Sequence, residues 1–227
     1  MTAESVQTWH PVWENIFATH SSWGKYPPEE LIRFVAANYY KAEPRSAVKV
    51  LEIGCGPGAG PTWYVAREGF SVYGIDGSPT AIAKAHVRFD AENLAGEFKV
   101  GDLSSLPWPD GMFDAVIDVA CLQHNSEKDT ESILGEVHRV LKDGGRHFSL
   151  TAKQGCWGDG SGPRVDSTSY KDLTAGPFAN MGVIRFATGD SLTRHYRHFR
   201  ELNFEYSVRS MQGRGVEISN WIVTCAK

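Results

Sequence analysis

The sequence lacks a long hydrophobic run, an excess of basic residues and a cysteine framework. No apolar stretch approaches the roughly 18 residues of a membrane helix, and the first residues lack the charged start and apolar core of a signal peptide. A net charge of −4 argues against nucleic-acid binding through overall electrostatics. The four cysteines show no CxxC or metal-ligand spacing. We therefore expect a cytoplasmic protein with reduced thiols and without a membrane or nucleic-acid partner; the oligomeric state stays open.

What is present is typical of one globular domain spanning residues 1–227. Hydrophobic residues make up 41% and charged residues 22% of the chain, which is enough for a substantial core. Residues 1–45 are rich in aromatic side chains and predict a helical cap. Residues 153–187 are rich in Gly, Ser, Asp and Pro without periodicity, which predicts a lid-like insertion or an exposed loop.

Between these segments, short apolar runs alternate with helical patterns, which predicts an α/β fold. A helix is expected after Pro27-Pro28, with Leu31, Phe34 and Val35 buried. Ser78-Pro79 and Ser126 should begin two further helices, and Gly144 should end the second. A last helix is expected over 190–199. Strands are expected over 48–53, 71–75, 97–100, 113–119, 146–150, 204–209 and 221–226, the last two forming an antiparallel edge.

The most informative segment runs from Val50 to Gly60. An apolar strand enters a loop with glycine at every second position, where the backbone can approach a ligand closely because glycine has no Cβ. A loop of this kind between a strand and a helix is typical of nucleotide-binding α/β folds. By itself it also satisfies the loose dinucleotide pattern, so the nucleotide is left open by the loop alone.

Acidic residues at three successive strand ends narrow the choice. Glu52, Asp76 and Asp102 each lie at the end of an expected strand. So many negative charges would repel a pyrophosphate. They suit a phosphate-free ligand that carries an amine, a ribose diol and an adenine amino group.

Four motifs in order resemble the class I S-adenosylmethionine-dependent methyltransferases: LEIGCGPG (51–58), YGIDGS (73–78), GDLSSLPWPDGMFDAVID (101–118) and EVHRVLKDGG (136–145). The resemblance covers about residues 47–151. It implies a Rossmann-like three-layer sandwich with a mostly parallel seven-stranded sheet and an antiparallel C-terminal strand. It also implies S-adenosyl-L-methionine as cofactor. The lid after the fifth strand and the absence of an added recognition domain favour a small-molecule methyl acceptor.

The resemblance also assigns cofactor-binding residues. Gly54, Gly56 and Gly58 would line the methionine and ribose, while Glu52 would shape the loop or reach the amine through water. Asp76 would accept both ribose hydroxyls, and Asp102 would take the adenine amino group beside the Leu103 backbone. Any one of these could instead be a turn residue or a helix cap. The remaining predicted cofactor contacts are Cys55, Ser78 and Val119 around the loop and strand ends, and Trp23 and Tyr26 as an aromatic cover.

The segment 118–124 follows the fourth strand and would pass under the methyl group. It lacks the Asn/Asp-Pro-Pro-aromatic pattern of methylases that act on exocyclic or amide nitrogens. His124 is the candidate general base, because imidazole titrates near neutrality; alternatively it packs against the donor or caps a helix. Asp118 and Asn125 lack the downstream acid–amide pair of metal-dependent relatives, so no metal is expected.

The aromatic residues Trp23 and Tyr26 and the basic run 194–200 each allow more than one interpretation. Trp23 or Tyr26 over the sulfonium would gain about 1–2 kcal/mol of cation–π energy, or the aromatic residues are simply core. The basic run 194–200 is an anion or RNA site, or a solvated helix face; Arg194 or Arg197 could also hold an acceptor carboxylate. The alternatives to a small-molecule methyltransferase are an RNA or protein methyltransferase, and an NAD-binding oxidoreductase or non-catalytic nucleotide-binding module. The acceptor and the attacked atom are left open.

Overall fold

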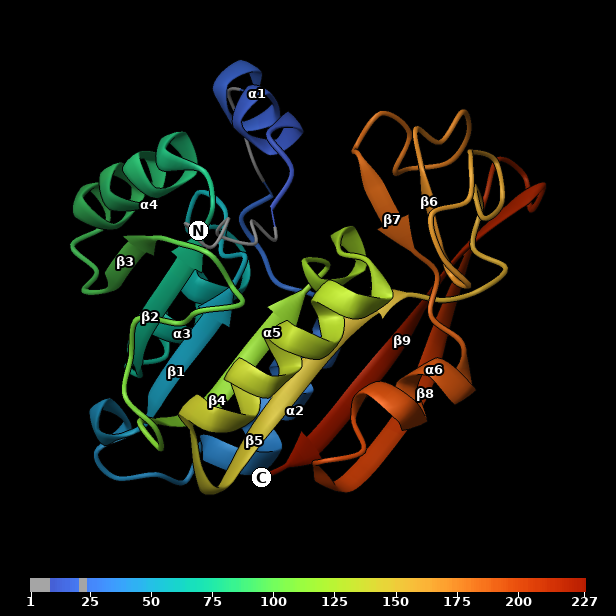
Figure 1. The fold of residues 1–227 in the computed structure, drawn as a ribbon. Helices are drawn as coiled ribbons and strands as arrows, with labels where there is room; N and C mark the ends of the chain where they lie inside the picture. Colours follow the sequence, from blue (N-terminus) through green and yellow to red (C-terminus); the bar gives the residue numbers. More distant parts are fainter. Residues whose placement is uncertain (1–8, 21–23) are drawn as a thin grey trace, which may run out of the picture.

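A seven-stranded sheet forms the centre of the protein (Figure 1), here in a computed structural model that describes residues 9–20 and 24–227. The strand order is β3-β2-β1-β4-β5-β9-β8. Strand β9 runs antiparallel to both of its neighbours, and the other pairings are parallel. This arrangement confirms the predicted fold class. The strands are β1 (Lys49–Ile53), β2 (Ser71–Asp76), β3 (Glu97–Val100), β4 (Phe113–Val119), β5 (Leu141–Ala152), β8 (Arg200–Met211) and β9 (Val216–Ala226).

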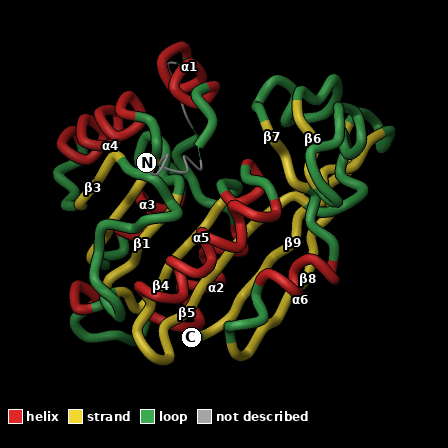
Figure 2. The backbone as a smooth tube through the Cα atoms, in the orientation of Figure 1, coloured by secondary structure: helices red, strands yellow, loops and turns green. Residues whose placement is uncertain are grey.

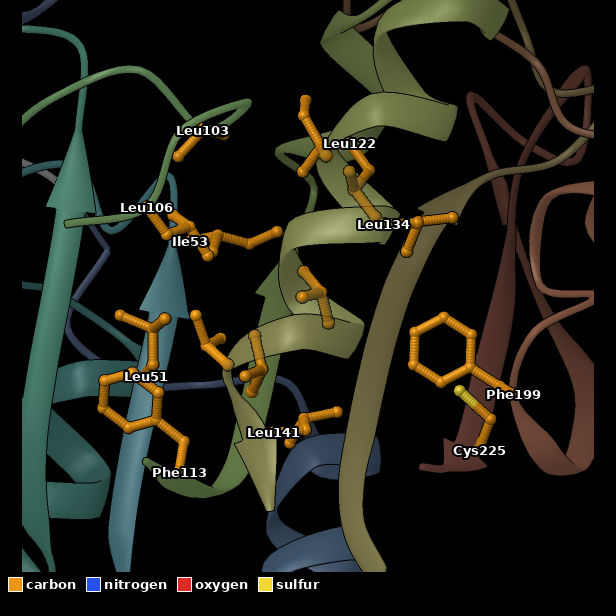
Figure 3. Close-up of a cluster of buried hydrophobic side chains, with 14 of the residues drawn as sticks. Leu51, Ile53, Leu103, Leu106, Phe113, Leu122, Leu134, Leu141, Phe199 and Cys225 are labelled. Carbon is orange, nitrogen blue, oxygen red and sulfur yellow. The ribbon is translucent and has the colours of Figure 1, made fainter. Parts of the chain in front are cut away.

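Helices cover both faces of the sheet and complete three layers (Figures 1 and 2). Helices α2 (Glu29–Tyr39), α3 (Pro61–Arg67) and α4 (Pro79–Ala91) bury apolar side chains in one core cluster. Helices α5 (Glu127–Val140) and α6 (Gly189–His195) contribute to a second cluster on the opposite face, part of which Figure 3 shows. Because both faces are covered, the central strands are almost continuously apolar. Two short 3₁₀ helices, η1 (Arg45–Ala47) and η2 (Leu122–His124), lie before β1 and after β4.

The helix starts follow the predicted local chemistry. The Ser78 hydroxyl accepts the Ala81 N–H (3.0 Å) at the start of α4, and Ser126 accepts the Asp129 N–H (3.2 Å) at the start of α5. Helix α2 opens with two acidic residues and buries Leu31 with its neighbours Phe34 and Val35, as predicted.

Several predicted boundaries were wrong. Helix α5 ends at Val140 and not at Gly144, because Leu141 already takes an extended conformation and pairs with Phe113 of β4. Gly144, with φ of +76°, instead makes a turn inside the long β5. Helix α6 ends at His195 rather than at residue 199. Strands β8 and β9 are longer than predicted because they pair with each other along almost their whole length.

The insertion 153–187 is more ordered than its composition predicted. It contains a two-stranded antiparallel sheet of β6 (Ser169–Lys171) and β7 (Val183–Arg185). Its buried side chains form a small cluster of their own: Ala152, Cys156, Leu173, Ile184 and Phe186. Strands of three residues between turns carry too short a pattern to be recognised from sequence. The lid role of the insertion stays a prediction.

Helix α1 (Val12–Thr19) and the insertion both lie beyond the carboxyl ends of the parallel strands, on two sides of the same edge (Figure 1). Ligands of open α/β sheets bind outside this edge. Among the described residues, no helix has the length and apolar character needed to cross a membrane.

Candidate active site

The glycine loop after β1 turns sharply in left-handed conformations. Gly54, Gly56, Gly58 and Gly60 have φ angles of +64°, +52°, +62° and +58°. A Cβ on Gly54 would lie 2.1 Å from the Sγ atom of Cys121, so only glycine fits there. The loop therefore presents bare backbone toward the end of the sheet.

Asp76, at the end of β2, holds this loop in place. Its Oδ2 atom accepts the Gly56 N–H (2.9 Å), and its Oδ1 atom accepts the Ser78 N–H (2.9 Å). Burial raises the pKa of the Asp76 carboxyl, while the two backbone donors oppose that change. A buried carboxylate between the glycine loop and α4 is in the position that the sequence predicted for a ribose-binding acid.

Glu52, on β1, shapes the loop from beneath. Its Oε2 atom accepts the Thr62 N–H (2.9 Å) at the first turn of α3, and burial raises the pKa of this carboxyl well above its usual range. The neighbouring Cys55 N–H donates to the Ile75 carbonyl (3.0 Å), which fastens the loop to β2. The contact with Thr62 fits the loop-shaping role that was one of the two predictions for Glu52.

A cavity of about 410 Å³ opens over this loop. Its wall includes most of the predicted site residues: Tyr26, Glu52, Gly54, Cys55, Gly56, Asp76, Leu103, Val119 and His124. Trp23 lies outside the described residues. The structure therefore brings the carboxyl ends of β1, β2 and β4 together around one space, although the role of each residue toward a ligand stays a prediction.

Three predicted contacts do not line the cavity. Gly58 faces α4, where an added Cβ would lie 2.9 Å from the Cβ of Ala85, so close helix packing requires this glycine. The Ser78 hydroxyl caps α4 and donates to Glu14. Asp102 is half-buried beside the cavity, and its Oδ1 atom accepts from the N–H (2.8 Å) and hydroxyl (2.7 Å) of Ser104.

The aromatic cover comes from residues that the sequence did not single out. Trp9, Trp13 and Phe17 all line the cavity. The Phe17 ring lies 3.3 Å from where a Cβ of Gly56 would be. Tyr26 also lines the cavity, although this residue is 78% exposed and its ring packs edge-on against Trp63.

Helix α1, which carries this cover, is fastened to α4 at both of its ends. Near its start, the Glu14 carboxylate accepts from the hydroxyls of Ser78 and Thr80, and these bonds lower the pKa of Glu14. At its other end, the Lys84 ammonium donates to the carbonyls of Phe17 and His20. We call these contacts the α1 latch.

Breaking the α1 latch is expected to loosen the cover. Glu14→Ala and Lys84→Ala should each speed release of S-adenosylhomocysteine about tenfold, because hydrogen bonds to charged groups contribute about 1.5–3 kcal/mol. Stopped-flow displacement measures the rate. The control is Arg33→Ala, which breaks the exposed ion pair with Glu29 on α2 and should leave the rate unchanged. Equal release rates in all four proteins would show that α1 does not retain the ligand.

His124 lies in η2 at the other side of the cavity. Its ring packs edge-on against Trp13 (centroids 4.5 Å apart) and Phe178 (6.1 Å). Burial lowers the pKa of His124 to about 3, so the imidazole is neutral and only weakly basic near pH 7. This environment does not favour the predicted general-base role, which stays a hypothesis.

The buried carboxylate of Asp118 stabilises the turn that follows β4. Its Oδ1 atom accepts the N–H groups of Cys121 (2.8 Å) and Leu122 (3.0 Å), and Ser149 donates to its Oδ2 atom, so it fixes the segment that carries His124. Among residues 9–20 and 24–227, no group of three or more His, Cys, Asp or Glu side chains has an arrangement able to hold a metal ion.

The basic run 194–200, on and after α6, lies outside the wall of the cavity over the glycine loop. Arg194 pairs with Glu127 (3.0 Å) and lines a separate pocket, and Arg197 pairs with Glu131. Neither arginine lines the cavity over the glycine loop. These contacts fit the interpretation as a solvated, ion-paired helix face.

The fold is that of a Rossmann-like protein, with a cavity at the carboxyl edge of its sheet. A family model described as a methyltransferase domain matches residues 50–145. Residues 50–145, less than half of the chain, are therefore similar to a methyltransferase domain, and the fold agrees with this similarity.

Individual relatives agree with that assignment. Norajmaline N-methyltransferase of Rauvolfia serpentina is 32% identical over 152 residues, which cover 58% of this chain and 50% of the relative. The chain thus spans about half the length of the curated relatives it matches.

Two solved structures share the fold. A methyltransferase of Methanosarcina mazei superposes with a TM-score of 0.66 at 22% identity, covering 90% of this chain and 99% of the other. The 1,6-didemethyltoxoflavin-N1-methyltransferase of Burkholderia thailandensis gives a TM-score of 0.59 at 19% identity, covering 87% and 78%.

Proposed function

We propose that the protein transfers a methyl group from S-adenosyl-L-methionine to a small-molecule acceptor by in-line displacement. The observation that carries this proposal is one cavity with two different ends. One end is bare glycine backbone with the buried carboxylate of Asp76, and the other is lined by side chains of α1 and of the insertion 153–187. A donor and an acceptor held in one closed space need little further catalysis, since positioning and exclusion of water lower the barrier.

The residues at the first end fit the donor. Gly54 and Gly56 allow close approach of a ligand to backbone, and Asp76 has the position and charge to accept ribose hydroxyls. Leu103 and Val119 supply apolar walls. We further propose that α1 and the insertion act as the two lids of this site.

The kind of acceptor is supported by the enclosure and by the relatives. The names of the relative from Rauvolfia and the structural neighbour from Burkholderia both specify small acceptors methylated on nitrogen. For the alternative of an RNA or protein substrate, the cavity wall would need to continue into a basic surface, whereas Arg194 and Arg197 are ion-paired away from it. We place the acceptor among small molecules.

Replacing Asp76 tests the donor site. Asp76→Ala should weaken S-adenosylhomocysteine binding at least tenfold, because charge-assisted hydrogen bonds to the ligand and to the Gly56 N–H are both lost. Calorimetry measures the affinity. Asp143→Ala, in an exposed turn near the start of β5, is the control and should bind normally.

The same experiment separates the nucleotide alternatives. S-adenosylmethionine and S-adenosylhomocysteine should bind the wild-type protein and NAD should not. Binding of NAD alone would exclude the methyltransferase function, and an unchanged affinity of Asp76→Ala would exclude the ribose contact.

A further inference from the structure

Strand β8 forms one end of the central sheet (Figure 1). It contains 12 residues, whereas β3 at the opposite end contains four. Among the described residues, β9 is the only strand that pairs with β8, so the other edge of β8 is free. A long free edge presents a row of backbone N–H and C=O groups to which another strand can pair. Strand β8 therefore offers a surface for strand addition that β3 is too short to offer.

Large apolar side chains are exposed along β8. Tyr206 is 60% exposed and Val208 is 47% exposed. The Tyr206 ring packs edge-on against Trp221 of β9 (centroids 5.8 Å apart), and the Lys153 ammonium lies 5.2 Å from its centroid. Because Tyr206 and Val208 are two positions apart on a strand, they lie on the same face of the sheet. Together they form an apolar patch at the end of the sheet.

Two charged residues of β8 have no partner of opposite charge within the described chain. Glu201 pairs with Arg146 (3.0 Å). In contrast, neither Glu205 nor Arg209 forms an ion pair with any residue that the structure describes. Four positions separate these two residues, which is about 13 Å along an extended strand. They are therefore too far apart to pair with each other.

A second copy of the same strand supplies the missing partners. When two β8 strands pair antiparallel about a two-fold axis at Ser207, Glu205 of each copy lies opposite Arg209 of the other. The same register places Tyr206 opposite Val208. Opposite charges and aromatic–β-branched pairs both stabilise a sheet when they face each other across two strands. Because of the two-fold axis, each favourable pair occurs twice.

Axes at the neighbouring residues do not give this match. An axis at Glu205 places the two Glu205 carboxylates opposite each other, and an axis at Arg209 does the same with the two guanidinium groups. Like charges in this position destabilise the pairing. An axis at Tyr206 or Val208 leaves both charges opposite uncharged side chains. The sequence of β8 therefore favours the register centred on Ser207.

We propose that two copies of the protein associate through their β8 strands, in antiparallel pairing centred on Ser207, and form a dimer with one continuous sheet. The other end of the sheet ends association at two copies, because β3 is short and its Glu97 carboxylate already pairs with Lys99 (2.9 Å). The dimer does not depend on the proposed methyl transfer.

Sedimentation velocity tests the association. Wild-type protein should shift from monomer to dimer between about 1 µM and about 300 µM, because small interfaces form weak complexes. Glu205→Arg and Arg209→Glu each turn two attractive pairs into two repulsive ones, and each should raise the Kd of the dimer at least about tenfold. Both residues are exposed, so both variants should keep the wild-type midpoint of urea unfolding. A wild-type protein that stays monomeric over the whole range overturns the proposal.

Mixing the two variants tests the register itself. In a mixed dimer, the charges at positions 205 and 209 of one copy again face charges of opposite sign in the other. An equimolar mixture of Glu205→Arg and Arg209→Glu should therefore dimerise as tightly as wild type. The double variant should dimerise by itself for the same reason. If neither the mixture nor the double variant recovers the dimer, the pairing centred on Ser207 is wrong.

The control is Asp90→Arg, which makes the same change of net charge at an exposed residue of α4. Its dimer should be as tight as that of the wild type. An equal loss in Asp90→Arg, or a full-strength dimer in both β8 variants, would assign the association to overall charge or to another surface. Calorimetry with S-adenosylhomocysteine on the same samples tests the proposed function separately, since binding of this ligand needs no dimer.

Hydrogen exchange locates the interface on the wild-type protein. Raising the concentration should slow exchange of backbone N–H groups within residues 203–211, because new hydrogen bonds protect the free edge. Residues 97–100 of β3 lie at the opposite end of the sheet and should exchange at the same rate at every concentration. Protection of β3 without protection of β8 would place the interface at the wrong end and overturn the proposal.

Discussion

Gly54→Ala is expected to weaken S-adenosylhomocysteine binding at least a hundredfold and to lower the free energy of unfolding by several kcal/mol. Two costs add. The left-handed φ of +64° costs an alanine about 1–2 kcal/mol. The new Cβ would also lie 2.1 Å from the Sγ and 2.5 Å from the Cβ of Cys121, and overpacking of this kind costs about 1–3 kcal/mol. Because Asp118 holds the Cys121 backbone, the glycine loop must move instead.

Two further variants separate the costs. Gly111 has the same φ of +64°, and nothing lies within 4 Å of an added Cβ, so Gly111→Ala should show the backbone strain alone and bind normally. Adding Cys121→Gly to Gly54→Ala removes both clashing atoms and should recover the packing part of the loss. Urea unfolding and calorimetry give the two quantities. A stable Gly54→Ala protein with wild-type affinity would contradict the described loop geometry.

Two buried histidines are expected to lower the stability of the protein as the pH falls from about 6.5 to about 4, an effect that the raised pKa values of the buried Glu52, Asp76 and Asp118 carboxyls oppose. Burial lowers the pKa of His147 and of His195 to about 4 in the folded protein, from an ordinary value of 6.5. The unfolded chain therefore takes up these protons first. The contribution of these two neutral histidines to stability is fully present above about pH 6.5. It is lost as the pH falls from there to the pKa of about 4 that they have in the folded protein. Each fully developed shift corresponds to about 3 kcal/mol.

His147 is the variant that tests this expectation. Its Nδ1 atom lies 3.0 Å from the Val116 carbonyl, and its ring stacks on Tyr196. His147→Gln should be less stable than wild type at pH 8. Between pH 7 and pH 4.5 its free energy of unfolding should fall less steeply, because unfolding takes up about one proton fewer than in the wild type. His86→Gln, which makes the same substitution at an exposed histidine of α4 outside the core clusters, is the control for the substitution itself. Parallel pH profiles for all three proteins would show that His147 titrates normally.

The glycine-loop end of the cavity was predictable because its signals are local. Gly54, Gly56 and Asp76 each depend on a short stretch of chain: glycine where the backbone turns left-handed, and an acid at a strand end. In a parallel sheet, all carboxyl ends meet at one edge, so the order of strands and helices already brings Glu52, Asp76 and His124 to the same side. The helix caps at Ser78 and Ser126 were recognisable for the same reason.

The end of the cavity beside His124 was decided by tertiary structure. Trp13 and Phe178 are more than 160 positions apart in the chain, and no pattern in either segment indicates that both meet His124. Gly58 belongs to the same loop and has the same left-handed conformation as Gly54 and Gly56, but it faces Ala85 of α4 and does not line the cavity.

The sequence by itself therefore determined the fold, the cofactor class and the edge of the sheet at which the cavity opens, because these follow from local conformation and strand order. Only the tertiary structure decided which aromatic side chains close the cavity and that His124 stays neutral. Burial and long-range packing set those properties, and both depend on residues far away in the chain.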